Sequence, residues 1–103
     1  AADEITSMMV NAVSQGEAKW AVPKGYKVAG KTGTAQIPVE GHYDEEKTLA
    51  SFVGFAPPTK PQFLMLVMLR EPKSSPWASE TAAPMWFSIA RELFPYLSIK
   101  PGD

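Results

Sequence analysis

Residues 30–36, with the sequence GKTGTAQ, decide the fold of this chain. They predict a strand over residues 27–36, although an unusual one, because Gly30, Gly33 and Ala35 give it little side-chain bulk. Glycine weakens the interior of a strand and often marks a place where a ligand or another backbone comes close. A bulge or a tightly packed site is the other explanation. We therefore expect this strand either to line a groove or to pack closely against a neighbour.

The side chains of this strand suit a groove that binds an anionic peptide. The Lys31 ammonium can attract a carboxylate or help to move a proton. Thr32 and Thr34 offer hydroxyls to an anionic group, Gly33 lets a substrate approach the backbone, and the Thr34 N–H can donate to a developing oxyanion. An extended peptide can also add along such an edge as a further strand. Because strict alternation puts Lys31 opposite the two threonines, all of them serve one groove only if the strand is a twisted edge.

A second pattern overlaps the first and indicates different chemistry. Gly25, four residues and then GKT at 30–32 match the phosphate-binding P-loop pattern. That loop needs a buried strand before it and a helix after it, so that backbone N–H groups face the phosphates. Residues 19–24 make a poor buried strand, and Pro38 and Gly41 make the following segment poor helix material. The nucleotide-binding hypothesis is therefore disfavoured.

The elements before and after this strand are predicted from apolar periodicity. Two apolar runs at residues 50–56 and 63–69, joined by a proline-rich turn at 57–61, predict an antiparallel hairpin. Residues 17–26 are expected to be a connection, and residues 37–47 a surface loop that contains His42, to which we assign no role. The first 16 residues predict a helix whose apolar stripe should face the core; the stripe consists of Ile5, Met8, Met9, Ala12 and Val13.

The final element is predicted to be a second helix. Pro84 suits its first turn, and Pro95 should disturb or end it. The resulting order of helix, three antiparallel strands and helix predicts an α+β fold in one domain. The expected core stripe of this helix consists of Trp86, Ile89, Ala90, Leu93 and Leu97.

The strand predicted at residues 63–69 has a consequence for the whole chain. Its sequence, FLMLVML, does not alternate, so both of its faces need cover. Two helices can cover one side of a three-stranded sheet, and an uncovered apolar face on the other side would favour aggregation. We therefore expect the chain to be part of a larger core or to associate extensively.

Composition excludes several classes of protein. Ten basic and eleven acidic residues give a net charge of −1, without the clustered basic excess of a nucleic-acid-binding domain. The absence of cysteine removes disulfides and thiolate metal sites. The longest apolar run is far shorter than the roughly 20 residues that span a bilayer, so no membrane contact is expected from this segment. We expect no cofactor and no metal.

The sequence resembles a known family at this strand and beyond it. Lys31-Thr32-Gly33 matches the third motif of the serine acyltransferases that include penicillin-binding proteins and class A β-lactamases. The longer string VAGKTGTAQ at residues 28–36 is similar to class B penicillin-binding proteins of the elongation and division type. Residues 51–57 (SFVGFAP) and 63–72 resemble the next two strands of that family. Residues 82–89 resemble the start of its last helix.

The resemblance implies a peptidoglycan D,D-transpeptidase that cross-links stem peptides and is acylated by β-lactam antibiotics. It implies a place in the bacterial cell envelope, at the outer face of the cytoplasmic membrane, with the anchor outside this chain. By the same likeness Lys31 is the motif lysine, and Thr32, Gly33 and Thr34 contact the substrate. Thr34 would also lend its N–H to the oxyanion hole, which makes Lys31 and Thr34 the catalytic candidates.

Two departures from the family are informative. None of the eight serines begins a Ser-x-x-Lys or Ser-x-Asn motif, so the nucleophile is absent from this sequence. We therefore expect residues 1–103 to be the carboxy-terminal portion of a transpeptidase domain, inactive without the remainder. Residues 77–80 (WASE) stand where many relatives have glycines, which leaves the shape of that loop open. The alternative is a small module that binds peptides along its exposed strand edge.

Overall fold

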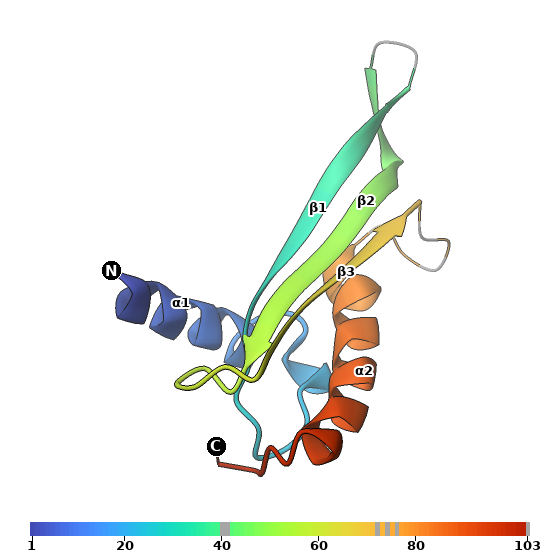
Figure 1. Cartoon of the computed structure of the whole chain (residues 1–103). Coiled ribbons are helices and arrows are strands. Elements are labelled where there is room, and N and C mark those ends of the chain that lie inside the picture. Colours follow the sequence, from blue (N-terminus) through green and yellow to red (C-terminus); the bar gives the residue numbers. More distant parts are fainter. Residues whose placement is uncertain (40–41, 72, 74, 76, 103) are drawn as a thin grey trace.

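The structure, a computed structural model, describes residues 1–39, 42–71, 73, 75 and 77–102, with the backbone alone at 38, 39 and 42–46. Two helices and a three-stranded antiparallel sheet follow one another in the predicted order, which confirms the α+β fold (Figure 1). The elements are α1 (Ala2–Ser14), the 3₁₀ turn η1 (Lys19–Ala21), β1 (Ala29–Val39), β2 (His42–Ala56), β3 (Phe63–Arg70), the 3₁₀ turn η2 (Ala78–Glu80) and α2 (Ala82–Tyr96).

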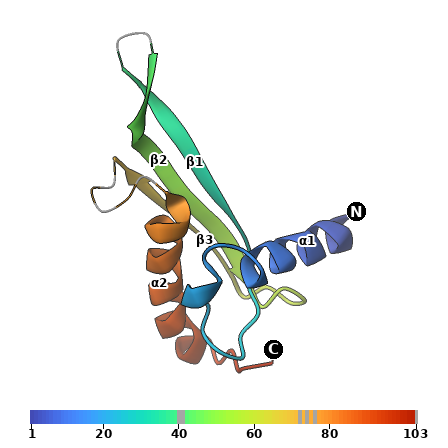
Figure 2. The same ribbon diagram turned by 180° about the vertical axis from the view of Figure 1, so that it is seen from behind.

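The register of the sheet assigns each side chain to one of two faces. The strand order is β1-β2-β3, so β1 is an edge strand of the described sheet. Thr32 lies opposite Phe52, and Phe52 lies opposite Val67, which places these three on one face. Lys31, Val53 and Leu66 are paired in the same way on the other face. The face of Thr32 is the one that α2 covers (Figure 2).

Aromatic side chains form the core between the sheet and α2. The Trp86 ring lies 5.2 Å from the Phe52 ring, edge to face, and Trp86 Nε1 donates a hydrogen bond of 2.8 Å to the Met65 carbonyl. A Cβ atom at Gly30 would lie 2.5 Å from Phe52 Cζ, and one at Gly54 would lie 2.9 Å from Trp86 Cζ2. Tight packing against the aromatic rings therefore explains these two glycines.

The opposite face of the sheet is open in the part of the chain that the structure describes. Leu64 is 71% exposed, and Leu66 and Met68 are also exposed, whereas their neighbours Phe63, Met65, Val67 and Leu69 turn toward the core cluster. Burial therefore alternates along β3, although its residues are apolar at almost every position. The expectation that both faces need cover, and that the two helices cover one side only, agrees with this arrangement.

The predicted core stripe of α1 is wrong within this chain. Val13 is buried, but Ile5 and Met8 are well exposed and Ala12 is exposed. The reason is geometric: α1 contacts β1 near its final turn and extends away from the sheet (Figures 1 and 2). Thr6 and Val10 lie beside the turn at Pro58, and no described residue buries Ile5 or Met8.

The stripe predicted for α2 is partly wrong. Trp86 and Ala90 are buried, but Ile89 is 40% exposed, and Phe87 and Phe94 are buried in addition. The face that meets the sheet is therefore rotated toward the larger aromatic residues, which bury more apolar area. Pro95 lies in the last turn of the helix, as expected.

The surface loop predicted at residues 37–47 is also wrong, because β1 continues to Val39 and β2 begins at His42. An edge strand tolerates a proline such as Pro38. The register shifts between Gln36 and Ile37, whose partners are Thr48 and Asp44. The bulge absorbs the extra residues of β2. The side chain of His42 lies outside the described part of the structure.

Of the helices described, none is long and apolar enough to cross a membrane.

Candidate active site

The candidate strand is regular and lies at the edge of the sheet. Residues 30–36 pair with residues 48–54 of β2 without interruption. The backbone therefore continues as a strand where a P-loop would wrap around phosphates and enter a helix. Gly25 has a positive φ of 87° and lies in a turn well before the strand. This geometry rules out the nucleotide-binding hypothesis.

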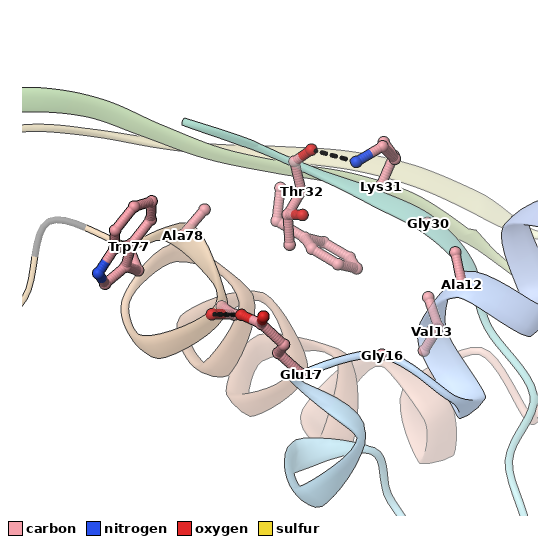
Figure 3. Close-up of a pocket in the computed structure, with 11 residues that line it drawn as sticks. Ala12, Val13, Gly16, Glu17, Gly30, Lys31, Thr32, Trp77 and Ala78 are labelled. Carbon is pink, nitrogen blue, oxygen red and sulfur yellow. Dashed lines mark hydrogen bonds between the residues drawn. The ribbon is translucent and has the colours of Figure 1, made fainter. Parts of the chain in front are cut away.

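Thr32 lies beside a pocket of about 250 Å³ between β1, the end of α1 and η2 (Figure 3). The residue is half-buried on the face that α2 covers, next to the Phe52 ring. The pocket lining consists of Ala12, Val13, Gly16, Glu17, Gly30, Lys31, Thr32, Phe52, Trp77, Ala78 and Ser79.

Thr34 is exposed and contacts the segment before α2. Its Oγ1 accepts a hydrogen bond of 3.2 Å from the backbone N–H of Ala78. The register puts Thr34 opposite Ala50, which is on the same face as Thr32 opposite Phe52. The structure therefore brings the two predicted threonines to one side of β1, and adds a partner from a distant part of the chain.

Lys31 lies on the other face of the strand. Its side chain is exposed, and its Nζ donates a hydrogen bond of 3.0 Å to the Thr32 carbonyl. Figure 3 shows this nitrogen on the side of the strand away from Glu17 and Ala78. The ammonium and the two threonine hydroxyls therefore lie on opposite faces of β1, although Lys31 and Thr32 both line the pocket at this edge. That Lys31, Thr32 and Thr34 serve one groove stays a prediction. It requires a ligand that lies along the edge of β1 and reaches side chains on both of its faces.

Gly33 leaves the backbone accessible on the face of Lys31. A Cβ atom there would come within 4 Å of a single group, the Ser51 hydroxyl at 2.8 Å. That hydroxyl donates a hydrogen bond of 3.4 Å to the Gly33 carbonyl. Gly33 therefore differs from Gly30, which the Phe52 ring covers, and it allows the close approach of a ligand that the sequence predicted.

The comparison with protein families decides where the chain belongs. A family model described as the penicillin binding protein transpeptidase domain matches residues 1–94. The chain belongs to the penicillin-binding protein transpeptidase family. The resemblance to class B penicillin-binding proteins is thereby confirmed.

Two curated relatives show how much of the longer proteins this transpeptidase chain represents. Stage V sporulation protein D of Bacillus subtilis is 36% identical over 99 residues, which are 95% of this chain and 15% of that protein. Peptidoglycan D,D-transpeptidase FtsI of Buchnera aphidicola is 42% identical over 80 residues, or 76% of this chain and 14% of that protein. The chain therefore spans about a seventh of the length of these relatives.

Solved structures agree with the fold. The transpeptidase domain of penicillin-binding protein 3 from Burkholderia pseudomallei matches with a TM-score of 0.82 and 33% identity, over 95% of this chain and 30% of that one. Penicillin-binding protein 3 of Mycobacterium tuberculosis, complexed with ampicillin, matches with a TM-score of 0.77 and 30% identity, over 96% of this chain and 25% of that one.

The sequence analysis left the shape of residues 77–80 open and missed the contacts that this turn makes in the transpeptidase chain. η2 lies within it, and Thr81 Oγ1 closes it with a hydrogen bond of 2.7 Å to the Trp77 carbonyl. Ser79 Oγ donates a bond of 3.2 Å to Glu17 Oε2, which links the turn to the segment after α1. The serine and threonine shortly before a helix were the available signal for a closed turn. Nothing local pointed to Glu17 or to Thr34 as the partners.

Proposed function

We propose that this chain supplies the wall carrying Lys31-Thr32-Gly33 in the active site of a peptidoglycan D,D-transpeptidase. Residues 1–103 are the carboxy-terminal portion of its transpeptidase domain. The remainder of that domain is the partner, and it brings the Ser-x-x-Lys and Ser-x-Asn motifs that this sequence lacks. The observation that carries the proposal is the edge strand at residues 30–36, in which Lys31 and Thr32 line the pocket and Thr34 bonds to Ala78 at its edge.

The reaction divides its roles between the two parts of the domain. The serine oxygen of the missing part attacks a carbonyl of the stem peptide, forms an ester and releases the terminal residue as an amine. The Thr34 N–H donates to the oxyanion that develops, and the hydroxyls of Thr32 and Thr34 bind the carboxylate of the substrate. Gly33 lets the substrate lie against the backbone. The Lys31 ammonium stabilises negative charge and assists proton transfer.

The names of relatives support the same substrates. A relative from Buchnera aphidicola is a peptidoglycan D,D-transpeptidase, and a neighbour from Mycobacterium tuberculosis is complexed with ampicillin. Stem peptides of peptidoglycan and β-lactam antibiotics are therefore the proposed ligands. The proposed location is the bacterial cell envelope, at the outer face of the cytoplasmic membrane.

Covalent labelling with a fluorescent penicillin tests the proposal. The 103-residue chain alone should stay unlabelled, because no serine in it belongs to a nucleophile motif. The complete domain should be labelled at the serine of Ser-x-x-Lys, and Lys31→Ala should lower the rate of labelling by about 100-fold, within the range of a lost acid–base or charge-stabilising group. Lys24→Ala removes an exposed lysine outside the strand and is the matched control, with an unchanged rate expected.

Two results would contradict the proposal. Labelling of the isolated chain at one of its own serines would show that the nucleophile lies within it. Equal rates for Lys31→Ala and Lys24→Ala in the complete domain would remove Lys31 from the site.

A further inference from the structure

The contact between Thr34 and Ala78 fixes what the threonine hydroxyl can do. A hydroxyl has one hydrogen to donate and two lone pairs that accept. The Ala78 N–H donates to Thr34 Oγ1 at 3.2 Å and so occupies one lone pair. The hydrogen of Thr34 is left to point elsewhere, toward an acceptor. An anionic ligand accepts hydrogen bonds, so the amide prepares the hydroxyl to donate to it.

The Ala78 amide is itself held in place from several directions. Ala78 is fully buried and is the first residue of η2, and the Thr81 hydroxyl closes the turn onto the Trp77 carbonyl at 2.7 Å. From the other side, Glu17 Oε2 accepts the Ser79 hydroxyl at 3.2 Å, with Ser79 nearly buried. Figure 3 shows Glu17 beneath the turn, with Ala78 between it and β1.

We propose that the turn at residues 77–81 is a positioning element for the transpeptidase site. The Ala78 amide orients the Thr34 hydroxyl as a donor to the carboxylate of the ligand. Glu17 is a positioning residue that acts through Ser79 and braces the turn presenting the amide. This inference rests on the proposed function. It adds a group from outside the Lys31-Thr32-Gly33 strand to the determinants of ligand recognition.

The plain alternative is that Thr34 does no more than satisfy an amide at the start of η2. The first N–H groups of a helical turn lack partners within it, and a nearby hydroxyl commonly provides one. In that case the contact stabilises the turn and affects all ligands alike. The two explanations differ in whether the effect depends on a carboxylate in the ligand.

Ala78→Pro removes the N–H that donates to Thr34, and the backbone conformation at this position is compatible with proline. Trp77 has φ −91° and ψ 133°, which is the extended conformation required before a proline. Proline is also well suited to the first position of a helical turn. Ala78→Gly is the matched control, because it removes the side chain and keeps the N–H.

The measurement is the second-order rate of acylation of the complete domain by benzylpenicillin and by its methyl ester. Ala78→Pro should slow acylation by the acid about three- to ten-fold, the range for one lost hydrogen bond, and leave the rate with the ester unchanged. Ala78→Gly keeps the N–H, so any change in its rate should be equal for the acid and the ester. For Ala78→Pro, equal slowing with acid and ester, or no slowing with the acid, would overturn the proposal.

Glu17 provides a second test that does not alter the backbone. Glu17→Ala should slow acylation by the acid about two- to five-fold and spare the ester, and Glu17→Gln should restore the rate because its amide oxygen still accepts from Ser79. Identical losses for Glu17→Ala and Glu17→Gln, or a loss shared by the ester, would overturn the role of Glu17. This pair decides the matter if Ala78→Pro does not fold.

The outcomes also separate this inference from the proposed function. A parent domain that reacts with neither compound would refute both. A parent domain that is acylated normally, and whose Ala78 and Glu17 variants do not distinguish acid from ester, would refute the positioning role alone.

Discussion

Replacing Gly30 by alanine should destabilise the protein, although Gly30 belongs to the strand that we propose lines the active site. The new Cβ would lie 2.5 Å from Phe52 Cζ, 2.8 Å from Phe52 Cε1 and 3.1 Å from the Val53 carbonyl oxygen. The Phe52 ring cannot simply swing aside, because Trp86 and Phe87 pack against it with ring centroids 5.2 and 5.4 Å away. The clash therefore has to be relieved by moving the core.

The size of the effect follows from two opposing contributions. Overpacking a well-filled core costs about 1–3 kcal/mol. Alanine in place of glycine within a strand returns about 0.5–1 kcal/mol through the lower entropy of the unfolded chain. The free energy of unfolding should therefore fall by about 1 kcal/mol, the difference between the middles of the two ranges. The backbone adds no strain, because Gly30 does not have a positive φ.

Gly33→Ala is the matched control, three residues along the same strand. Its Cβ would meet the Ser51 hydroxyl at 2.8 Å, and that small group can rotate away. We expect its free energy of unfolding to stay within about 0.5 kcal/mol of the parent. Acylation by penicillin should nevertheless slow, because the methyl group would stand where a ligand is proposed to approach the backbone.

Urea denaturation of the complete domain, followed by tryptophan fluorescence, measures the difference. The midpoint for Gly30→Ala should fall, with an unchanged dependence on urea concentration. Equal stability of Gly30→Ala and Gly33→Ala would refute the reasoning, because it would mean that the Phe52 ring does not press on Gly30.

Two further changes test the core and the open face. Trp86→Phe should lower the free energy of unfolding by about 1–3 kcal/mol, because the Met65 carbonyl loses the donor at 2.8 Å. Trp20→Phe, at a residue 66% exposed, should change it by less than about 0.5 kcal/mol in the same urea titration. Leu66→Lys, on the open face, should destabilise the complete domain by more than about 2 kcal/mol and yet raise the solubility of the 103-residue chain. Unchanged stability of the complete domain would show that no other part of it covers this face.

The order and type of the elements could be predicted from the sequence because they depend on local periodicity. The helices and strands follow the spacing of apolar residues, and the turn at residues 57–61 follows its prolines. The extent of the hairpin could not be predicted. Pro38 looked like a loop residue, and its tolerance in β1 depends on the strand being at the edge of the sheet.

Burial was harder to predict than secondary structure, because it depends on which surfaces meet. Ile89 and Phe87 fit a helical stripe equally well by spacing, and the position of the sheet decides that Phe87 is buried. The apolar residues of α1 fit a core stripe too, but no described element reaches its outer part.

The candidate site was predictable where it lies within one segment and unpredictable where it joins distant ones. Lys31, Thr32, Gly33 and Thr34 stand out by residue type and order. The Ala78 N–H and the Glu17–Ser79 pair come from residues far along the chain from β1 and from each other. Every residue except proline has a backbone N–H, so the sequence does not indicate which one bonds to Thr34. Only the structure identifies the Ala78 N–H as that donor.

The uncovered face of the sheet makes this chain suited to use as one piece of a split reporter. If the remainder of the proposed domain is produced separately, we expect the two pieces to dock across the exposed residues Leu64, Leu66 and Met68, which would bring the serine to the strand. A fluorescent penicillin would then give a signal only from the reassembled pair. The intensity of that signal would report the amount of assembled complex. Substitutions on the open face would change the affinity between the two pieces.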